Sequence, residues 1–151
     1  MESRVERAVE NFKSGCNCSQ AVLLAYADLI GLDEKTAMLL SSGLGGGVGR
    51  MREVCGAFNA AAIVVGMKVG SLDPNDRQAK KHTYETVQKV AEEFKKTNRS
   101  IVCRELLGLD KTEKETATPD ERTAEYYKKR PCAHIVADAA RALEAVIFNE
   151  E

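Results

Sequence analysis

The sequence predicts an all-α fold, a single-domain helical bundle of about six to eight helices around a buried central helix. Apolar residues recur every three or four positions in one segment after another, which is the spacing of an amphipathic helix. No segment shows the strict alternation of apolar and polar residues that is typical of a half-buried strand. No internal repeat is visible, so residues 1–151 are treated as one domain.

Start and stop signals place the first two helices. Ser3 opens a capping-box pattern, and apolar residues then recur at helical spacing, so a helix is expected over residues 3–13. Asn17 suits the N-cap of the second helix, with Gln20 as its capping-box partner. Gly31 is expected to end this helix, because glycine readily adopts the left-handed conformation of a C-cap.

The stretch 41–70 joins a glycine-rich loop to the most apolar segment of the chain. A short third helix, opened by Asp33, ends where this loop begins. The apolar segment is expected to form the central helix over roughly residues 51–68, because a helix that is apolar on all sides belongs inside a bundle. Cys55 therefore lies where a flexible loop meets the central helix, a favourable place for a site. The loop glycines are Gly43, Gly45, Gly46, Gly47 and Gly49.

A long helix and a short one are expected next. Asp73 and Pro74 supply a cap and a first-turn proline for an amphipathic helix that ends near Thr97. The many charged side chains of this helix are interpreted as a solvated face. Ser100 is expected to cap a short helix that ends at Gly108.

Two more helices are expected after a polar connection. Residues 109–118 have no apolar pattern and are predicted to form an exposed loop. Thr118 and Pro119 have the form of another cap and first-turn proline, which would start a helix to about Lys129. The last helix begins near Pro131 and carries an apolar stripe along one side.

Composition excludes several classes of partner. The 151 residues are 44% hydrophobic and 30% charged, with a net charge of −1, so neither nucleic acid nor an anionic membrane is an expected partner. The N-terminus lacks the apolar core of a signal peptide, and no apolar run reaches the ~20 residues of a membrane span. A cytoplasmic protein is therefore expected, in which the five cysteines are mostly reduced and available for metal or redox chemistry.

Four of the five cysteines occupy the same kind of position. Each lies in or near the first turn of an expected helix, where free backbone N–H groups and the helix dipole favour a thiolate. Arg104 and Arg130 are sequence neighbours of two of them and would lower the thiol pKa further. Four helices that each present one cysteine could build one shared site. The candidate residues for redox chemistry, cofactor binding or metal binding are Cys18, Cys55, Cys103 and Cys132.

Simpler explanations compete with this one. Cysteine is among the most buried residue types, so each thiol could be an inert core residue. There is no C-x-x-C motif, and hence neither a zinc knuckle nor a thioredoxin-type motif is present.

His134 would point to a different side of the helix from Cys132, which disfavours it as a ligand. The glycine loop lacks the ending of a P-loop and is expected to let helices pass closely and to give backbone N–H groups to the sulfurs near Cys55. Tyr126 and Tyr127 are explained by packing on a helix surface.

Five segments together match a known pattern: Asn17 to Val22 (NCSQAV), the glycine loop, Cys55-Gly56-Ala57, Cys103 to Gly108 (CRELLG), and Arg130-Pro131-Cys132. They cover nearly the whole chain, and their combination is specific. On these residues the chain resembles the C_GCAxxG_C_C family of redox-active proteins, which is known by four cysteines and a CGAxxG motif. The resemblance makes Cys18, Cys55, Cys103 and Cys132 the family's four cysteines and leaves Cys16 as an extra one.

The resemblance implies redox activity or metal binding rather than a particular reaction. Relatives resemble a domain that stands beside haem modules in a cytochrome where an iron–sulfur centre is also held, and other relatives lie near transporter genes. One position departs from the motif, because its last glycine is Ala60 in this chain. The alanine adds a methyl group where the family is expected to pack closely.

Three functions are compatible with these features. In the first, the four cysteines hold an iron–sulfur cluster or another thiophilic metal, with zinc less favoured, for electron transfer to a partner that the sequence does not identify. In the second, the same cysteines exchange thiols and disulfides without a metal. In the third, the protein is a non-catalytic helical interaction protein with buried structural thiols, and a homodimer is compatible with it.

Overall fold

The computed structural model describes residues 1–109 and 116–149 and confirms the all-α prediction. Within these ranges the only strand-like pairing is one antiparallel bridge between Val54 and Val102. The α-helices are α1 (Val5–Lys13), α2 (Cys18–Tyr26), α3 (Glu34–Ser41), α4 (Gly56–Val69), α5 (Arg77–Asn98), α6 (Cys103–Leu106), α7 (Ala124–Lys129) and α8 (Cys132–Ile147), and the 3-10 helices are η1 (Ala27–Ile30) and η2 (Ser42–Leu44).

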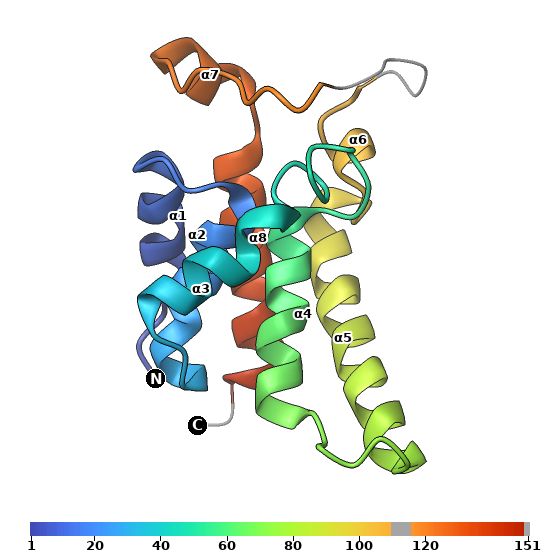
Figure 1. Cartoon of the computed structure of the whole chain (residues 1–151). Helices are drawn as coiled ribbons and strands as arrows, with labels where there is room; N and C mark the ends of the chain where they lie inside the picture. The colour runs from blue at the N-terminus through green and yellow to red at the C-terminus, as the bar shows by residue number, and fades with distance from the viewer. Residues whose placement is uncertain (110–115, 150–151) are drawn as a thin grey trace.

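Helix α2 lies at the centre of the bundle and packs against α1, α3, α4 and α8. The long helix α5 covers α4 and α8 from the other side. Helices α2, α4 and α8 all begin at the same end of the bundle, the upper end in Figure 1. The glycine loop, α6 and α7 gather at this end, so the segments that the sequence singled out lie together (Figure 1). None of the described helices is long and apolar enough to span a bilayer.

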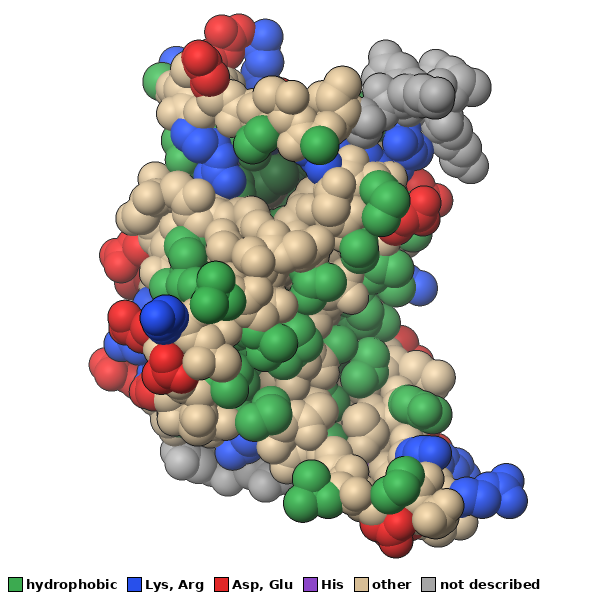
Figure 2. Space-filling model, viewed as in Figure 1, with side chains coloured by type: hydrophobic (Ala, Val, Ile, Leu, Met, Phe, Trp, Pro, Cys, Tyr) green, Lys and Arg blue, Asp and Glu red, His purple; other side chains and the backbone are tan. Residues whose placement is uncertain are grey.

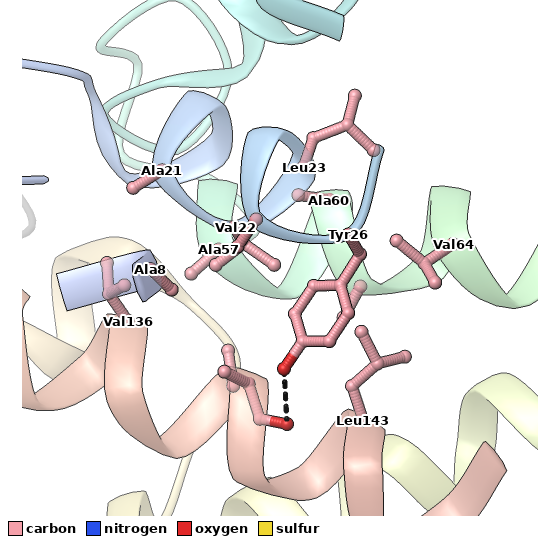
Figure 3. Close-up of a cluster of buried hydrophobic side chains, with 14 of the residues drawn as sticks. Ala8, Ala21, Val22, Leu23, Tyr26, Ala57, Ala60, Val64, Val136 and Leu143 are labelled. Atoms are coloured by element: carbon pink, nitrogen blue, oxygen red, sulfur yellow. Dashed lines mark hydrogen bonds between the residues drawn. The ribbon is translucent and has the colours of Figure 1, made fainter. Parts of the chain in front are cut away.

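A buried polar contact joins three helices through the core. The ring of Tyr26 is fully buried among apolar side chains of α2, α4 and α8, and its hydroxyl points toward α8 (Figure 3). This hydroxyl donates a 2.5 Å hydrogen bond to the Glu144 carboxylate, which also accepts the Arg4 backbone N–H at 2.8 Å. Burial, followed by the hydrogen bond to Glu144, raises the pKa of Tyr26 well above its ordinary value. The hydroxyl is therefore un-ionised at neutral pH.

Some predicted helix signals are confirmed, and the first start signal of the chain is wrong. Asn17 and Gln20 form both hydrogen bonds of the capping box at the start of α2. Gly31 ends η1 in the left-handed conformation, with φ of 74°. The capping box at Ser3 is absent, because α1 begins at Val5 without a side-chain cap. The preceding residue, Arg4, is instead held by remote partners, Glu144 through its N–H and Asp28 through its guanidinium.

Two further start signals, at Asp73 and at Thr118, are wrong. Asp73 accepts a hydrogen bond from the Asn75 N–H in a turn, and Asp76 is the residue that caps α5. The predicted start at Thr118 and Pro119 is also wrong, because Thr123 caps α7 instead. Of the predicted loop 109–118, residues 110–115 lie outside the described residues, and residues 116–118 are exposed.

The helix that begins after the glycine loop differs from the prediction in its start and its surroundings. Helix α4 starts at Gly56, and the residues before it pair with the segment that leads into α6. The N–H of Cys55 donates to the Ile101 carbonyl at 2.7 Å, and the N–H of Cys103 donates to the Glu53 carbonyl at 2.7 Å. One side of α4 faces outward, and apolar side chains of α3 and α4 are visible on that surface (Figure 2).

Candidate functional site

The four predicted cysteines lie at four helix starts. Cys18, Cys103 and Cys132 are the first residues of α2, α6 and α8, and Cys55 is the N-cap of α4. The prediction that they share this placement is confirmed. All four helix starts lie at the end of the bundle where the glycine loop and α7 are found (Figure 1).

A cavity of about 400 Å³ opens at this end of the bundle and is visible as a hollow beneath the uppermost segment in Figure 2. Cys18, Cys103 and Cys132 are part of its wall. Cys55 is not part of the wall and is only 4% exposed, but it interacts electrostatically with Cys18 and Cys103. The structure therefore brings three of the candidate cysteines to one cavity and places the fourth close to two of them.

The glycine loop is a left-handed turn. The five consecutive residues from Gly46 to Arg50 have φ between 58° and 73°, and Arg52 has φ of 61°. This conformation costs little for glycine but is strained for Val48, whose branched side chain rarely adopts it. Strain of this kind persists only where the surrounding structure imposes it, and it is concentrated at functional sites. Here the strained turn carries Arg50 and Arg52 to the cavity wall.

The loop contacts two of the cysteines, and its contact with Cys103 is closer than a side chain would allow. A Cβ atom added to Gly47 would lie 2.6 Å from Cys103 Cβ, so this approach requires glycine. The backbone of Gly46 hydrogen-bonds to the Cys18 thiol. The sequence predicted that loop N–H groups would serve the sulfurs near Cys55. The structure assigns the loop contact to Cys18, whereas Cys55 is hydrogen-bonded by backbone groups in the first turn of α4.

The predicted lowering of the thiol pKa is wrong for three of the four cysteines. The pKa of Cys132 is raised to about 11, first by burial and then by charge on Cys18 and Cys103, although Arg130 and the Tyr126 hydroxyl act in the opposite direction. Burial is also the main cause of the raised pKa of Cys18 and of Cys55. Removal from water disfavours the thiolate more than the helix start favours it.

Alkylation should report this raised pKa at Cys132. In the reduced, metal-free protein we expect the rate of reaction with iodoacetamide to increase about tenfold per pH unit from pH 7 to 9.5, because only the thiolate reacts and its fraction is still far from saturation. Mass spectrometry of the peptide that contains Cys132 measures the rate. A rate that levels off below pH 9 would contradict the raised pKa. Circular dichroism at each pH checks that the protein stays folded.

The sequence missed several residues of the cavity wall. Arg52 is only 6% exposed, and its guanidinium donates to Cys103 Sγ at 3.7 Å. Tyr126 was interpreted as surface packing, but it lines the cavity and its hydroxyl hydrogen-bonds to Cys132. Arg122 and Arg130 also line the wall. Of these three residues only Tyr126 lies within α7, because Arg122 precedes its N-cap and Arg130 is its C-cap, so no helical spacing in the sequence reveals the group.

Other candidate features lie outside the cavity wall. His134 is exposed, and Cys16 contacts the Met38 sulfur at 3.9 Å. Ala60, which replaces the last glycine of the motif, is fully buried in the core near Tyr26 (Figure 3). All five cysteines are free thiols. Among the described residues, no three His, Cys, Asp or Glu side chains are arranged to bind one metal ion.

Comparison with known proteins identifies a family. No curated protein and no solved structure matches the chain. Residues 16–146 match the family described as "Putative redox-active protein (C_GCAxxG_C_C)". The matched range contains all four candidate cysteines and the glycine loop, and every described residue of the cavity wall except Phe12. The chain therefore belongs to the C_GCAxxG_C_C family of redox-active proteins.

Proposed function

We propose that Cys18, Cys55, Cys103 and Cys132 form one redox centre that holds an iron–sulfur cluster, or another thiophilic metal, for electron transfer. Four cysteine thiolates are the usual ligand set of such clusters, and a bound cluster would supply the one-electron chemistry. The protein's contribution is to hold four thiols at four separate helix starts, three of them in the wall of one cavity and the fourth, Cys55, behind it. The electron-transfer partner stays unidentified, and a homodimer stays a prediction.

The mutual repulsion of the thiols carries this proposal. Charge on Cys18 raises the pKa of both Cys55 and Cys132, and charge on Cys103 raises the pKa of Cys18, Cys55 and Cys132. A buried set of this kind cannot ionise without a compensating cation, and metal binding supplies that cation as it releases the protons. The same raised pKa values disfavour thiol–disulfide exchange, which needs an attacking thiolate near neutral pH.

The arrangement favours a cluster over a single ion. A single zinc ion needs its sulfur ligands at about 2.3 Å from one point. Within the described part of the chain, no three potential ligands are placed in that way. A cluster instead receives its cysteines at separate iron atoms, so its ligands can stand farther apart. The backbone hydrogen bond from Gly46 to Cys18 would then tune the potential of the centre.

Reconstitution under anaerobic conditions tests the proposal. We expect the reduced protein, incubated with ferrous iron and sulfide, to develop broad visible charge-transfer absorption and to retain iron and sulfide after desalting. Replacing Cys18, Cys55, Cys103 or Cys132 singly by serine should lower the iron content. Cys16→Ser is the matched control, because the Cys16 sulfur contacts Met38 and, unlike Cys55, interacts with none of the other cysteines, so that it should be dispensable.

A colourless, metal-free protein in which Cys18, Cys55, Cys103 and Cys132 all titrate as free thiols would contradict the proposal. Oxidation of such a protein to a disulfide between two of the four cysteines, reversed by dithiothreitol, would support the thiol–disulfide function instead. A loss of bound iron in Cys16→Ser as large as in Cys18→Ser would also count against a site made of these four residues.

A further inference from the structure

The cavity wall is strongly cationic, although the whole chain carries a net charge of −1. Four arginines line it, and Asp120 is the one acidic side chain among the described residues of the wall. The arginines come from two separate parts of the chain, the glycine loop and the region around α7. They are Arg50, Arg52, Arg122 and Arg130.

The fold holds these guanidinium groups in place even though two of the arginines must adopt an unfavourable backbone conformation. Arg50 and Arg52 both have left-handed backbone conformations, which are unfavourable for residues with a Cβ atom. Arg122 stacks on the Phe12 ring at 4.4 Å and donates to the carbonyls of Phe12 and Cys16. Like charges gathered in a partly buried cavity repel each other, so their assembly favours an anion between them.

One carboxylate already occupies part of this wall. Asp120 Oδ2 accepts hydrogen bonds from Arg50 at 3.0 Å and from Arg130 at 3.2 Å. The Asp120 side chain is 43% exposed and belongs to the irregular segment before α7, which Arg50 also holds through the Thr116 carbonyl. The arginine side chains are less exposed, Arg50 at 16% and Arg130 at 25%, but water reaches the Asp120 carboxylate, so an anion from solution can compete with it for the two arginines.

We propose that the cavity binds a small organic anion, whose carboxylate or phosphate group replaces Asp120 between Arg50 and Arg130 beside the thiols. Guanidinium groups recognise both kinds of anion through paired hydrogen bonds. A cavity of about 400 Å³ lies in the range that accommodates small-molecule ligands. Asp120 then acts as an internal competitor that holds the segment before α7 against the cavity until the ligand displaces it. The proposal goes beyond the redox function and does not require that a metal be bound.

Two alkylating reagents that differ mainly in charge test the proposal at Cys132. The probes are iodoacetate, a small carboxylate, and neutral iodoacetamide, both applied to the reduced and chelator-treated full chain. The quantity measured is the rate with iodoacetate divided by the rate with iodoacetamide. The thiolate fraction cancels in this ratio, and the same cysteine in the urea-unfolded chain supplies the reference ratio. In the folded protein we expect the ratio to exceed this reference about fivefold, because the partly exposed arginines of the cavity attract the anionic reagent and not the neutral one.

Three variants show which side chains raise the ratio of the two rates at Cys132. Arg50→Gln should lower the ratio toward the unfolded reference, and Asp120→Asn should raise it above that of the unmutated protein because it removes the carboxylate that competes with the anion for Arg50 and Arg130. Arg141→Gln is the charge-matched control, since it removes an exposed cation outside the cavity and should leave the ratio unchanged. A ratio equal to the reference, or equal shifts in Arg50→Gln and Arg141→Gln, would overturn the proposal.

Protection experiments then identify the anionic group. Citrate and glycerol 3-phosphate, compared at equal ionic strength, should slow the reaction of Cys132 with iodoacetamide, and more strongly in Asp120→Asn. Protection by citrate alone assigns a carboxylate ligand, and protection by glycerol 3-phosphate alone assigns a phosphate ester. Protection by neither would overturn the proposal. Because these measurements use the metal-free protein, their failure leaves the reconstitution result unaffected.

Discussion

Replacing Gly56 with alanine is expected to lower the free energy of unfolding by about 1–3 kcal/mol, as overpacking of a dense interior does. The added Cβ would lie 2.6 Å from the Leu44 carbonyl oxygen and 2.7 Å from Cys18 Sγ. Neither neighbour can retreat easily, because Leu44 contributes backbone and Cys18 is fixed at the start of α2. The variant should therefore unfold at lower urea concentration and lose iron–sulfur loading in the reconstitution assay.

Helix α4 supplies a matched control for this substitution. Gly66 lies in the same helix, and a Cβ atom added there would meet no atom within 4 Å. Gly66→Ala should therefore increase the free energy of unfolding by up to about 1 kcal/mol, because alanine restricts the unfolded chain and favours helix. Equal effects of the two substitutions would show that the close contact at Gly56 has no energetic importance.

The second large effect expected is a steep loss of stability at alkaline pH in the reduced, metal-free protein. The pKa values of Cys18, Cys55 and Cys132 are raised in the folded state, so the folded protein keeps protons that the unfolded chain releases. Their stabilising contribution is complete below the thiol pKa of the unfolded chain, near 9, and is lost as the pH rises above it. Each such thiol lowers the free energy of unfolding by about 1.4 kcal/mol per pH unit.

Urea unfolding at pH 7.5, 9 and 10 measures this dependence. The loss between pH 9 and 10 should be about 1 kcal/mol from Cys132, whose pKa is raised to about 11, and the raised pKa values of Cys18 and Cys55 increase it. Cys132→Ala should make the dependence shallower by about 1 kcal/mol over this range, because one releasable proton is removed. A free energy of unfolding that stays constant between pH 8 and 10 would contradict the raised pKa values.

Helix boundaries were predictable where the cap acts on its own helix. Asn17 and Asp33 cap α2 and α3 through backbone N–H groups three residues away, so the local sequence contains the whole interaction. The start predicted at Thr118 failed because Asp120, two residues later, is held by Arg50 and Arg130. Arg50 is 70 residues away in the sequence, and no local pattern reveals that contact.

In the candidate site, too, the local features could be predicted from the sequence and the features that depend on packing could not. The helix-start placement of the cysteines is a local property, and the sequence predicts it. The direction of the pKa shifts is not local, because it depends on how much water the folded protein removes from the thiols. The contact between Tyr126 and Cys132 and the position of Arg52 beside Cys103 likewise arise only when α7 and the glycine loop pack at the end of the bundle.

The distribution of the four cysteines along the chain links the site to the order of folding. Residues 18, 55, 103 and 132 belong to four different helix starts, and the closest two in sequence are 29 residues apart. Contacts between such distant residues form late, because each requires the closure of a long loop. A partly folded chain therefore presents scattered thiols, and the complete ligand set appears only when α8 has docked against α1, α4 and α5. Cofactor loading is thus expected to follow folding, which protects the nascent chain from binding a metal through an incomplete set of cysteines.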